Sequence, residues 1–372
     1  MNKKKILTII LIILFIGFVA ERINTNKSDV YEEQNKNSIK KNKNMLSMNL
    51  EQTAGAGDYK TVTQSSWPTK GYKFNAELSR CENGSTLSWD DTKKTVIMQG
   101  NVSDKCYVYF DLIPSMTLAE YVISQYTGVQ GENSIYYHNS SLENGAGDNS
   151  YRYAGASDSV NNYICLGSDA TTCPDANLFR IIGVFGDQTK VIRAKSVGDQ
   201  KWNTSKANAW SSSSLNTYLN GEYLTNLGTL ADKIATTTWK VGGGSSTYLY
   251  DVPTTAYQYE VGSSASTTTY EAKIGLMYAS DYGFAASSSA WTTKLSSYSS
   301  NTSKNWLYLG SYEWTISRYS GGTTGAFVVG GSGGVGSDAV TSSCAARPSF
   351  NLESSVKYVS GSGTIENPIR IN

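Results

Sequence analysis

Hydrophobic residues are distributed unevenly along the chain, and the first block of them stands alone. Residues 6–20 are apolar apart from Thr8 and Gly17, and three lysines precede them. As a helix this block would span about 22 Å, which is short for a bilayer core of about 30 Å. Because a basic flank stays on the cytoplasmic side, the rest of the chain is expected to be exported.

Two interpretations of residues 1–20 remain, an uncleaved membrane anchor and a cleaved secretion signal. Cleavage after Ala20 would place the bulky Phe18 at a position that requires a small residue, which favours the anchor. The predicted location is therefore the cell membrane, with a single N-terminal span through residues 6–20 and the bulk of the chain outside. A secreted protein is the alternative.

The segment after the anchor, residues 21–58, is rich in Lys, Asn, Glu, Ser and Gln and almost free of aromatic residues. Such a composition cannot bury enough apolar surface to fold, so a solvated polar tether is expected. Residues 59–112 then alternate between apolar and polar positions and contain several turn signals, which predicts a small all-β module. A disulfide between Cys81 and Cys106 would stabilise a module of this size.

Residues 113–372 are predicted to form one larger domain. A helix is expected over 114–126, where Thr117 and Glu120 have the spacing of a capping box. An amphipathic helix is expected over 212–227. Residues 178–185 are continuously apolar and β-branched, as in a fully buried strand, and 190–194 would complete a hairpin with it.

The C-terminal stretch, residues 347–372, shows a strand pattern up to the last few positions. A chain that ends in this way usually has its terminus paired into a sheet, and we expect 178–185 to be its partner. A buried strand is also expected over 274–280. The predicted fold class is therefore α+β, with a twisted antiparallel sheet and two helices in this domain.

Cysteine use agrees with export. Cys165 and Cys173 are separated by a turn and can clip a hairpin, which with Cys81–Cys106 makes two predicted disulfides and indicates an oxidising compartment. Cys344 has no evident partner. A reactive thiol or a bond to another chain is one interpretation of it, and a small buried residue is the more common one.

Charge and motif content exclude several functions. The formal net charge is +1, so nucleic acid is not an expected partner. His138 is the only histidine; a Ser–His–Asp triad or a multi-histidine zinc site is therefore not expected, and we interpret it as an exposed loop residue. The glycine triplet 242–244 lacks the Lys-Ser/Thr pair of a phosphate loop. Neither a metal nor a cofactor is predicted.

Several segments together carry a family resemblance: LFRIIGVF (178–185), SSLNTYLNGEYL (213–224), IGLMYASDYGFA (274–285), NWLYLGSYEWTISR (305–318) and RPSFNLESSVKYVSGSGTIENPIRIN (347–372). They resemble a poorly characterised C-terminal domain of exported bacterial surface proteins. That domain is distantly similar to the C-type-lectin-like fold of formylglycine-generating enzymes and of variable ligand-binding proteins from phages and bacteria. The resemblance implies paired chain ends, helices packed on a twisted sheet and long loops that form a binding face.

The same resemblance argues against two activities. Formylglycine-generating enzymes use two closely spaced cysteines near the C-terminus, where this chain has only Cys344, so oxidase activity is not expected. The calcium-binding sugar motifs of animal lectins are also missing. Residues 366–368 contain related letters in a different order.

The chain contains 26 Tyr and 8 Trp, whereas only 17% of its residues are charged, a mixture that resembles antibody binding loops. We therefore predict a surface protein that binds a glycan or a protein through aromatic, polar loops. The candidate ligand-binding residues are Trp202, Trp210, Asp281, Trp291, Tyr312, Glu313 and Arg318.

Two alternatives differ in class. Asp281 and Glu313 could act as paired carboxylates of a cell-wall hydrolase, in which case they should lie within about 10 Å of each other in a cleft. The domain could instead be a structural, wall-associated module without a small ligand, and it would then show no concave polar and aromatic pocket. Enzymatic activity is the less expected outcome.

Overall fold

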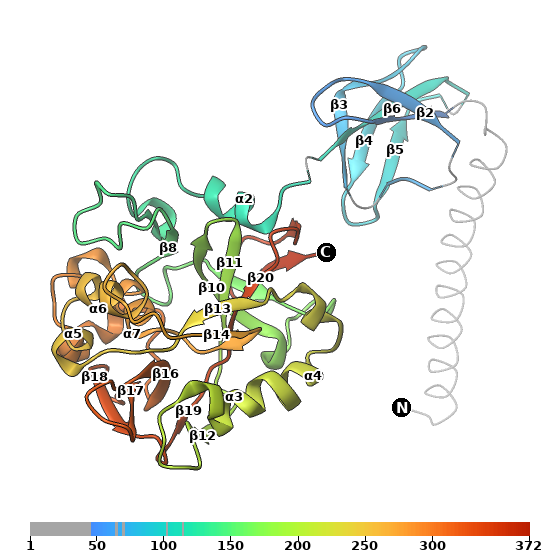
Figure 1. The fold of residues 1–372 in the computed structure, drawn as a ribbon. Helices are drawn as coiled ribbons and strands as arrows, with labels where there is room; N and C mark the ends of the chain where they lie inside the picture. The colour runs from blue at the N-terminus through green and yellow to red at the C-terminus, as the bar shows by residue number, and fades with distance from the viewer. Residues whose placement is uncertain (1–45, 64–65, 69–70, 102, 114) are drawn as a thin grey trace, which may run out of the picture. The chain divides into compact units, whose positions relative to one another are not determined.

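The computed structural model describes residues 46–63, 66–68, 71–101, 103–113 and 115–372 (Figure 1). The predictions for the membrane anchor and for most of the tether lie outside these residues. The chain divides between Ser115 and Met116 into two compact units. Within the described ranges, no helix is both long and apolar enough to cross a membrane.

The first unit is built from strands. Its four-stranded sheet has the order β2-β1-β6-β3, and a separate β4–β5 hairpin accompanies it. Met48, Leu50, Val108 and Phe110 form its buried core. The strand bounds are β1 Leu46–Glu51, β2 Tyr59–Val62, β3 Tyr72–Cys81, β4 Thr86–Asp90, β5 Thr95–Gln99 and β6 Cys106–Leu112.

The tether predicted for residues 21–58 extends too far, because residues 46–51 form β1 inside this sheet. β1 pairs in parallel with β6, so its partner lies at the far end of the module's sequence. Leu46, Met48 and Leu50 alternate with polar residues, which is the period of two typical of a strand. The prediction missed this short pattern because the segment around it is polar.

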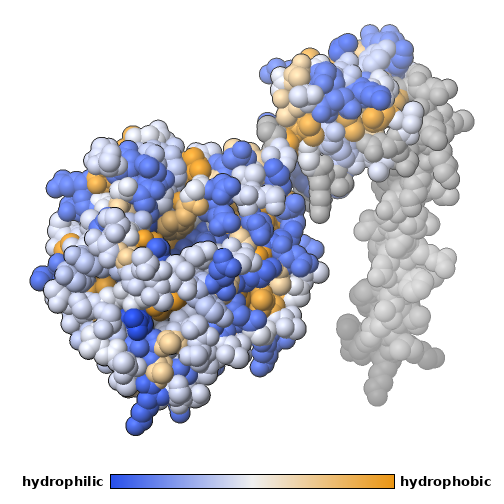
Figure 2. All heavy atoms as spheres, viewed as in Figure 1, coloured by the Kyte–Doolittle hydropathy of each residue, from blue (hydrophilic) through white to orange (hydrophobic). Residues whose placement is uncertain are grey.

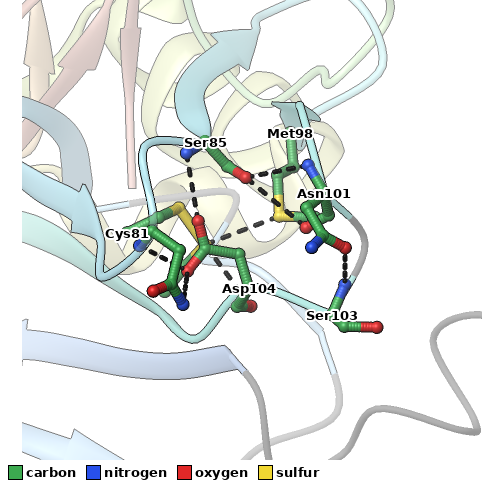
Figure 3. The surroundings of a disulfide bond; sticks show 8 residues. Cys81, Ser85, Met98, Asn101, Ser103 and Asp104 are labelled. Atoms are coloured by element: carbon green, nitrogen blue, oxygen red, sulfur yellow. Dashed lines mark hydrogen bonds between the residues drawn. A yellow bond between two sulfur atoms is a disulfide. The ribbon is translucent and has the colours of Figure 1, made fainter.

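The predicted disulfide between Cys81 and Cys106 is confirmed. The two cysteines are directly opposite each other on the neighbouring strands β3 and β6. Beside them, the Asp104 carboxylate accepts hydrogen bonds from the backbone N–H of Asn83 at 2.8 Å and of Ser85 at 3.0 Å (Figure 3). The disulfide and this carboxylate together fix the loop that leads into the β4–β5 hairpin.

The second unit contains three sheets and several short helices, and its mixed α+β class is as predicted. The nine-stranded sheet has the order β15-β20-β11-β10-β9-β22-β21, with β8 pairing β10 and β7 pairing β8; the five-stranded sheet has the order β12-β19-β16-β17-β18; β13 and β14 form the third. The strand bounds are β7 Ile135–Tyr137, β8 Tyr151–Tyr153, β9 Tyr163–Cys165, β10 Leu178–Phe185, β11 Gln188–Arg193, β12 Asp199–Lys201, β13 Thr237–Lys240, β14 Thr269–Ala272, β15 Ile274–Gly275, β16 Glu313–Arg318, β17 Gly325–Val329, β18 Val335–Ala339, β19 Ser343–Ala345, β20 Ser349–Leu352, β21 Tyr358–Ser360 and β22 Ile369–Ile371.

The predicted hairpin is confirmed as β10 and β11, which pair antiparallel through the centre of the large sheet. Gly183 lies where their register shifts and where β8 approaches. A Cβ at this position would come within 2.2 Å of the Tyr151 carbonyl oxygen, so the third strand can reach β10 only beside a glycine.

The C-terminal stretch joins the large sheet, but the expected direct partner was wrong. β20 pairs with β11, and β22 pairs in parallel with β9. Both edges of β10 are already occupied by β11 on one side and by β9 and β8 on the other. The terminal strands therefore lie one position further out on each side of β10.

Helices are shorter and more numerous than the two that were predicted. The capping box at Thr117 and Glu120 is confirmed at the start of α2. The predicted helix over 212–227 is present as α3 and α4, joined by a single π-helical turn, η4. The α-helices are α2 Leu118–Ser124, α3 Ser214–Tyr218, α4 Leu224–Asn226, α5 Ser246–Leu249, α6 Pro253–Glu260 and α7 Ala279–Phe284. The remaining helical turns are η1 Glu132–Ser134, η2 Asp175–Asn177, η3 Trp210–Ser212, η4 Leu219–Tyr223, η5 Gly228–Lys233, η6 Ser288–Ala290 and η7 Leu295–Lys304.

The strand predicted over 274–280 was mostly wrong. Only Ile274 and Gly275 pair as β15, and α7 begins at Ala279. The Asp281 carboxylate accepts a hydrogen bond from the Tyr278 backbone N–H at 2.9 Å, so it caps this helix. The sequence did not show where α7 begins, because every residue of α7 is buried and the apolar pattern therefore continues from the strand into the helix.

We expect the Cys81–Cys106 bridge to determine the stability of the first unit. Replacing both cysteines with serine should lower its free energy of unfolding by about 3 kcal/mol, because the reduced chain regains loop entropy. Urea unfolding of the full chain, followed by the fluorescence of the tryptophans, measures this change.

The matched control replaces Cys165 and Cys173, which close a loop with a sequence separation of 8 instead of 25. That variant should leave the transition of the first unit where it is. An unchanged first-unit transition in the Cys81/Cys106 variant would contradict the expectation.

Candidate functional site

The tryptophans expected on a binding surface lie in the core, so this prediction was wrong. Trp202, Trp210 and Trp291 are each at most 1% exposed. The Trp202 indole N–H donates to the Thr315 carbonyl at 3.1 Å, and that of Trp291 donates to the Ala286 carbonyl at 3.0 Å. These rings contribute packing area to the core and present no face to a ligand.

Asp281 is also buried, and it lies at the centre of an ionic network. Its Oδ2 accepts a hydrogen bond from Lys190 Nζ at 2.5 Å, and its Oδ1 lies 3.5 Å from Arg152 Nη1. Arg152 pairs in turn with Asp148 at 2.6 Å. The network joins β8, β11 and the first turn of α7, with two cations and two carboxylates in alternation.

Aromatic rings surround the cations of this network. Lys190 Nζ lies 4.7 Å from the ring centre of Tyr278 and 5.5 Å from that of Trp239. The Arg152 guanidinium lies 4.6 Å from the ring of Phe185. Burial lowers the pKa of Lys190, while the charge of Asp281 acts in the opposite direction. The rings offset part of the lost hydration through cation–π attraction.

A further buried carboxylate, Glu260 at the end of α6, lies beneath the start of α7. Its oxygens accept hydrogen bonds from the backbone N–H groups of Ala279 at 3.0 Å and Ser280 at 2.8 Å, and from the Ser317 hydroxyl. Burial raises the pKa of Glu260, and these hydrogen bonds counteract that rise. Glu260 was not among the predicted site residues, because a single acid among polar residues carries no local signal in the sequence.

Glu313 is held by Arg347 in a two-pronged ion pair. Arg347 Nε donates to Glu313 Oε1 at 2.6 Å and Nη2 donates to Oε2 at 2.8 Å, and both side chains are buried. Asp281 and Glu313 are therefore each neutralised by an internal cation. This arrangement is typical of structural ion pairs and does not provide the free carboxyl pair that a hydrolase needs.

His138 is buried, which corrects the prediction of an exposed loop residue. Its Nδ1 accepts a hydrogen bond from the Ala146 backbone N–H at 3.0 Å, and its ring packs against Phe284 and Trp291. Burial and the nearby charge of Arg152 lower the pKa of His138 well below its ordinary value. The imidazole is therefore a neutral core group.

Two of the predicted binding residues reach the surface. Tyr312 is 58% exposed and lies over the backbone of Gly330 and Gly331 in the β17–β18 turn. Arg318 is partly exposed and donates from Nε to the Gly242 carbonyl at 2.9 Å. They lie near opposite ends of β16, so they do not form one compact site.

The more promising concave surface was not predicted. A hollow of about 350 Å³ lies beside the edge strand β12, and it is lined by Asp199, Gln200, Lys201, Thr204, Ser214, Leu215 and Ser343. Pairing of β12 with β19 places Lys201 opposite Ser343, and α3 contributes Ser214 and Leu215. A smaller hollow, about 90 Å³, is lined by Tyr121, Gln125, Asn133, Tyr153, Ser159, Asn161, Ser362 and Ile369.

The β12 hollow combines groups that bind polar ligands. It offers one carboxylate, one ammonium group, one primary amide and three hydroxyls, with Leu215 as the apolar member. On the face shown in Figure 2, hydrophobic residues of the second unit form separate spots among hydrophilic and neutral ones. In the described part of the chain, no group of three or more His, Cys, Asp or Glu side chains could hold a metal ion.

The predicted disulfide between Cys165 and Cys173 is confirmed, and Cys344 is a buried free cysteine. Burial raises the pKa of the Cys344 thiol to about 11, so it stays protonated at neutral pH and reacts slowly. Comparison with protein-family models, curated proteins and solved structures finds no match for this chain.

Asp148 should make the second unit sensitive to acid. Burial alone would raise the pKa of this carboxyl, but Arg152 and the hydrogen bonds from Ser150 outweigh it and lower the pKa from 3.8 to about 2. Because the folded-state pKa is the lower one, Asp148 stabilises the fold above about pH 4 and loses this effect as the pH falls towards 2. We expect Asp148→Asn to cost about 2 kcal/mol at neutral pH and much less at about pH 2.

Urea unfolding of wild type and variant across this pH range measures the difference. Asp158→Asn, at an exposed position of the same region, is the matched control and should be neutral throughout. A difference between wild type and Asp148→Asn that stays constant with pH would show that the charge of Asp148 is not its source.

Breaking the Glu313–Arg347 pair should destabilise the second unit strongly. Glu313→Gln leaves the Arg347 charge buried without its counter-ion, which typically costs about 3–5 kcal/mol. Urea unfolding measures the loss, and Glu353→Gln at an exposed position serves as the control. A Glu313→Gln variant with wild-type stability would indicate that Glu313 has a role other than this pairing.

Proposed function

We propose that this chain is an exported, membrane-anchored protein of the bacterial cell surface whose second unit binds a glycan in the β12 hollow. The polar lining of that hollow is the observation that carries the proposal. Hydroxyl, amide, carboxylate and ammonium groups match the hydrogen-bonding pattern of a sugar.

Export is supported by the covalent chemistry of the chain. Both disulfides join cysteines that are close in sequence, with separations of 25 and 8 residues. Such bridges persist in oxidising compartments and are rare where thiols are kept reduced. The apolar block at residues 6–20, with its lysine flank, supplies the anchor in this proposal.

A C-type-lectin-like fold for the second unit is part of the proposal. Its support is the pairing of the unit's two ends: the Leu118 N–H donates to the Val356 carbonyl at 2.8 Å, and the Tyr358 N–H donates to the Met116 carbonyl at 3.1 Å. Paired ends are what the sequence resemblance implies for this fold.

A structural, wall-associated role is the second candidate, and one observation favours it. No aromatic side chain lines the β12 hollow, although glycan sites commonly stack sugar rings on exposed aromatics. The six tryptophans of the second unit are all buried. A rigid spacer would need such a core and no ligand.

The test is binding of the full chain, produced under oxidising conditions, to an array of glycans and cell-wall fragments. Lys201→Ala removes a charged donor from the β12 hollow and should weaken binding about tenfold. Lys304→Ala, an exposed lysine on η7, is the matched control and should bind as wild type does.

Tyr312→Ala is measured in parallel, because Tyr312 is the exposed aromatic residue among the predicted binding residues. Binding that depends on Tyr312 but not on Lys201 would move the site to the β16–β17 region. Binding that neither variant alters would contradict the proposal that the glycan binds in the β12 hollow. Absence of binding across the array would favour the structural role.

A further inference from the structure

Lys190 and Asp281 are in direct contact inside the core of the second unit. Their side chains are 7% and 3% exposed, and Lys190 Nζ lies 2.5 Å from Asp281 Oδ2. The residues are 91 positions apart in sequence, one on the central strand β11 and the other in the first turn of α7. A primary amine and a carboxyl group are thus held together where water has little access.

The contact keeps the lysine amine beside the carboxyl group. Lys190 Nζ lies 2.5 Å from Oδ2, and Oδ2 is bonded to the carboxyl carbon Cγ, so the amine is a close neighbour of the carbon that it would attack. Neither side chain can drift away easily, since β11 is paired on both edges and Asp281 caps α7.

The carboxyl group is polarised from both sides. The Tyr278 backbone N–H donates to Oδ2 at 2.9 Å, and Arg152 Nη1 lies 3.5 Å from Oδ1. A tetrahedral intermediate at Cγ would place negative charge on Oδ1, beside this guanidinium. Donors fixed beforehand at the site of developing charge are the usual way in which a protein stabilises such an intermediate.

Attack requires the neutral amine, and burial makes proton loss from the Lys190 ammonium group easier than it is in water. Three aromatic rings, of Phe185, Trp239 and Tyr278, lie within 5.7 Å of Lys190 Nζ. Burial lowers the pKa of Lys190. Glu260, close beneath the same helix end, is a second buried carboxyl whose pKa burial raises. A buried site of this kind disfavours separated charges, and an amide between the two side chains would carry no charge.

We propose that Lys190 and Asp281 condense to form an intramolecular isopeptide bond. The Nζ–Cγ bond forms and the Cγ–Oδ2 bond breaks. Oδ2 leaves as water with two hydrogens from the lysine ammonium group, and the third hydrogen remains on the amide nitrogen. No oxidant, reductant or other reagent is consumed. Oδ1 remains as the amide carbonyl oxygen, next to Arg152.

Such a bond would staple β11 to α7 over 91 residues, whereas the two disulfides close separations of only 25 and 8. Closing a longer loop removes more entropy from the unfolded chain. An amide would also survive reducing conditions that open disulfides. A surface protein exposed to changing redox conditions would retain its largest covalent loop.

Mass spectrometry of a tryptic digest of the full chain tests the proposal directly. Trypsin cannot cut after an acylated lysine, so residues 181–193 should stay intact and remain joined to residues 274–294. The joined species should weigh one water less than the two peptides together. The Cys81–Cys106 bridge should link peptides 81–93 and 106–152, and the Cys165–Cys173 bridge should lie within peptide 153–180. Detection of both in the same unreduced digest verifies that the chain has folded.

Lys190→Arg is the matched control, because arginine keeps the buried positive charge but its guanidinium is not a nucleophile. This variant should lose the joined species completely and release residues 274–294 as a free peptide. Free peptides 181–190 and 274–294 from folded wild type, without the joined species, would overturn the proposal. A joined species that persists in Lys190→Arg would overturn it as well.

Discussion

Burial of charge is the constraint on which the second unit depends. Removing Arg152, Lys190 and Asp281 from water is costly, and their attraction compensates only when every group has well-placed partners. Asp281 meets this condition by accepting from a lysine, an arginine and the N–H that begins α7. The positions of β8, β11 and α7 are therefore coupled through one carboxylate.

The same reasoning explains why the core contains several separate ionic arrangements. Glu313 and Arg347 tie β16 to the segment before β20, and Arg347 also donates to the Leu307 carbonyl at 2.6 Å. Arg180 on β10 donates to the Asn162 side chain at 2.6 Å and lies 4.7 Å from the ring of Trp306. Each arrangement joins segments distant in sequence. Together they specify how short helices and strands are placed in a unit with few long elements.

The sequence predicts features of this fold that depend on near neighbours. The capping box at Thr117, the β10–β11 hairpin and both disulfides follow from residues a few positions apart or from cysteine number, and all are present. Features that depend on distant pairing were lost or misplaced. β1 pairs with β6 across more than half of the first module, and β22 pairs with β9 rather than β10. The hydrophobic pattern of a segment indicates which of its side chains are buried, but it does not identify the strand with which that segment pairs.

The candidate site shows the same division. Asp281 and Glu313 were predicted as ligand-binding residues or as a carboxylate pair, but their chemistry depends on Lys190 and Arg347, which lie 91 and 34 positions away. The β12 hollow could not be predicted, because its lining comes from a short edge strand, from α3 and from β19. None of these segments carries an unusual composition. Only the folded chain brings their polar groups to one concavity.

Aromatic residues divide by type between the core and its margin, and this division changes the functional interpretation. The tryptophans of the second unit are buried, whereas many tyrosines are half-buried. Some of these tyrosines stack in pairs: the ring centres are 3.5 Å apart for Tyr248 and Tyr259, and 3.7 Å apart for Tyr121 and Tyr358. A tyrosine can cover the edge of a core with its ring while its hydroxyl stays in water.

With charged residues at only 17% of the chain, such tyrosines can provide the boundary between core and solvent that lysine and glutamate side chains often provide. The high tyrosine content is then explained by packing and need not indicate a binding face. Evidence for a ligand must instead come from concave polar surface, and for that reason the β12 hollow carries the functional proposal.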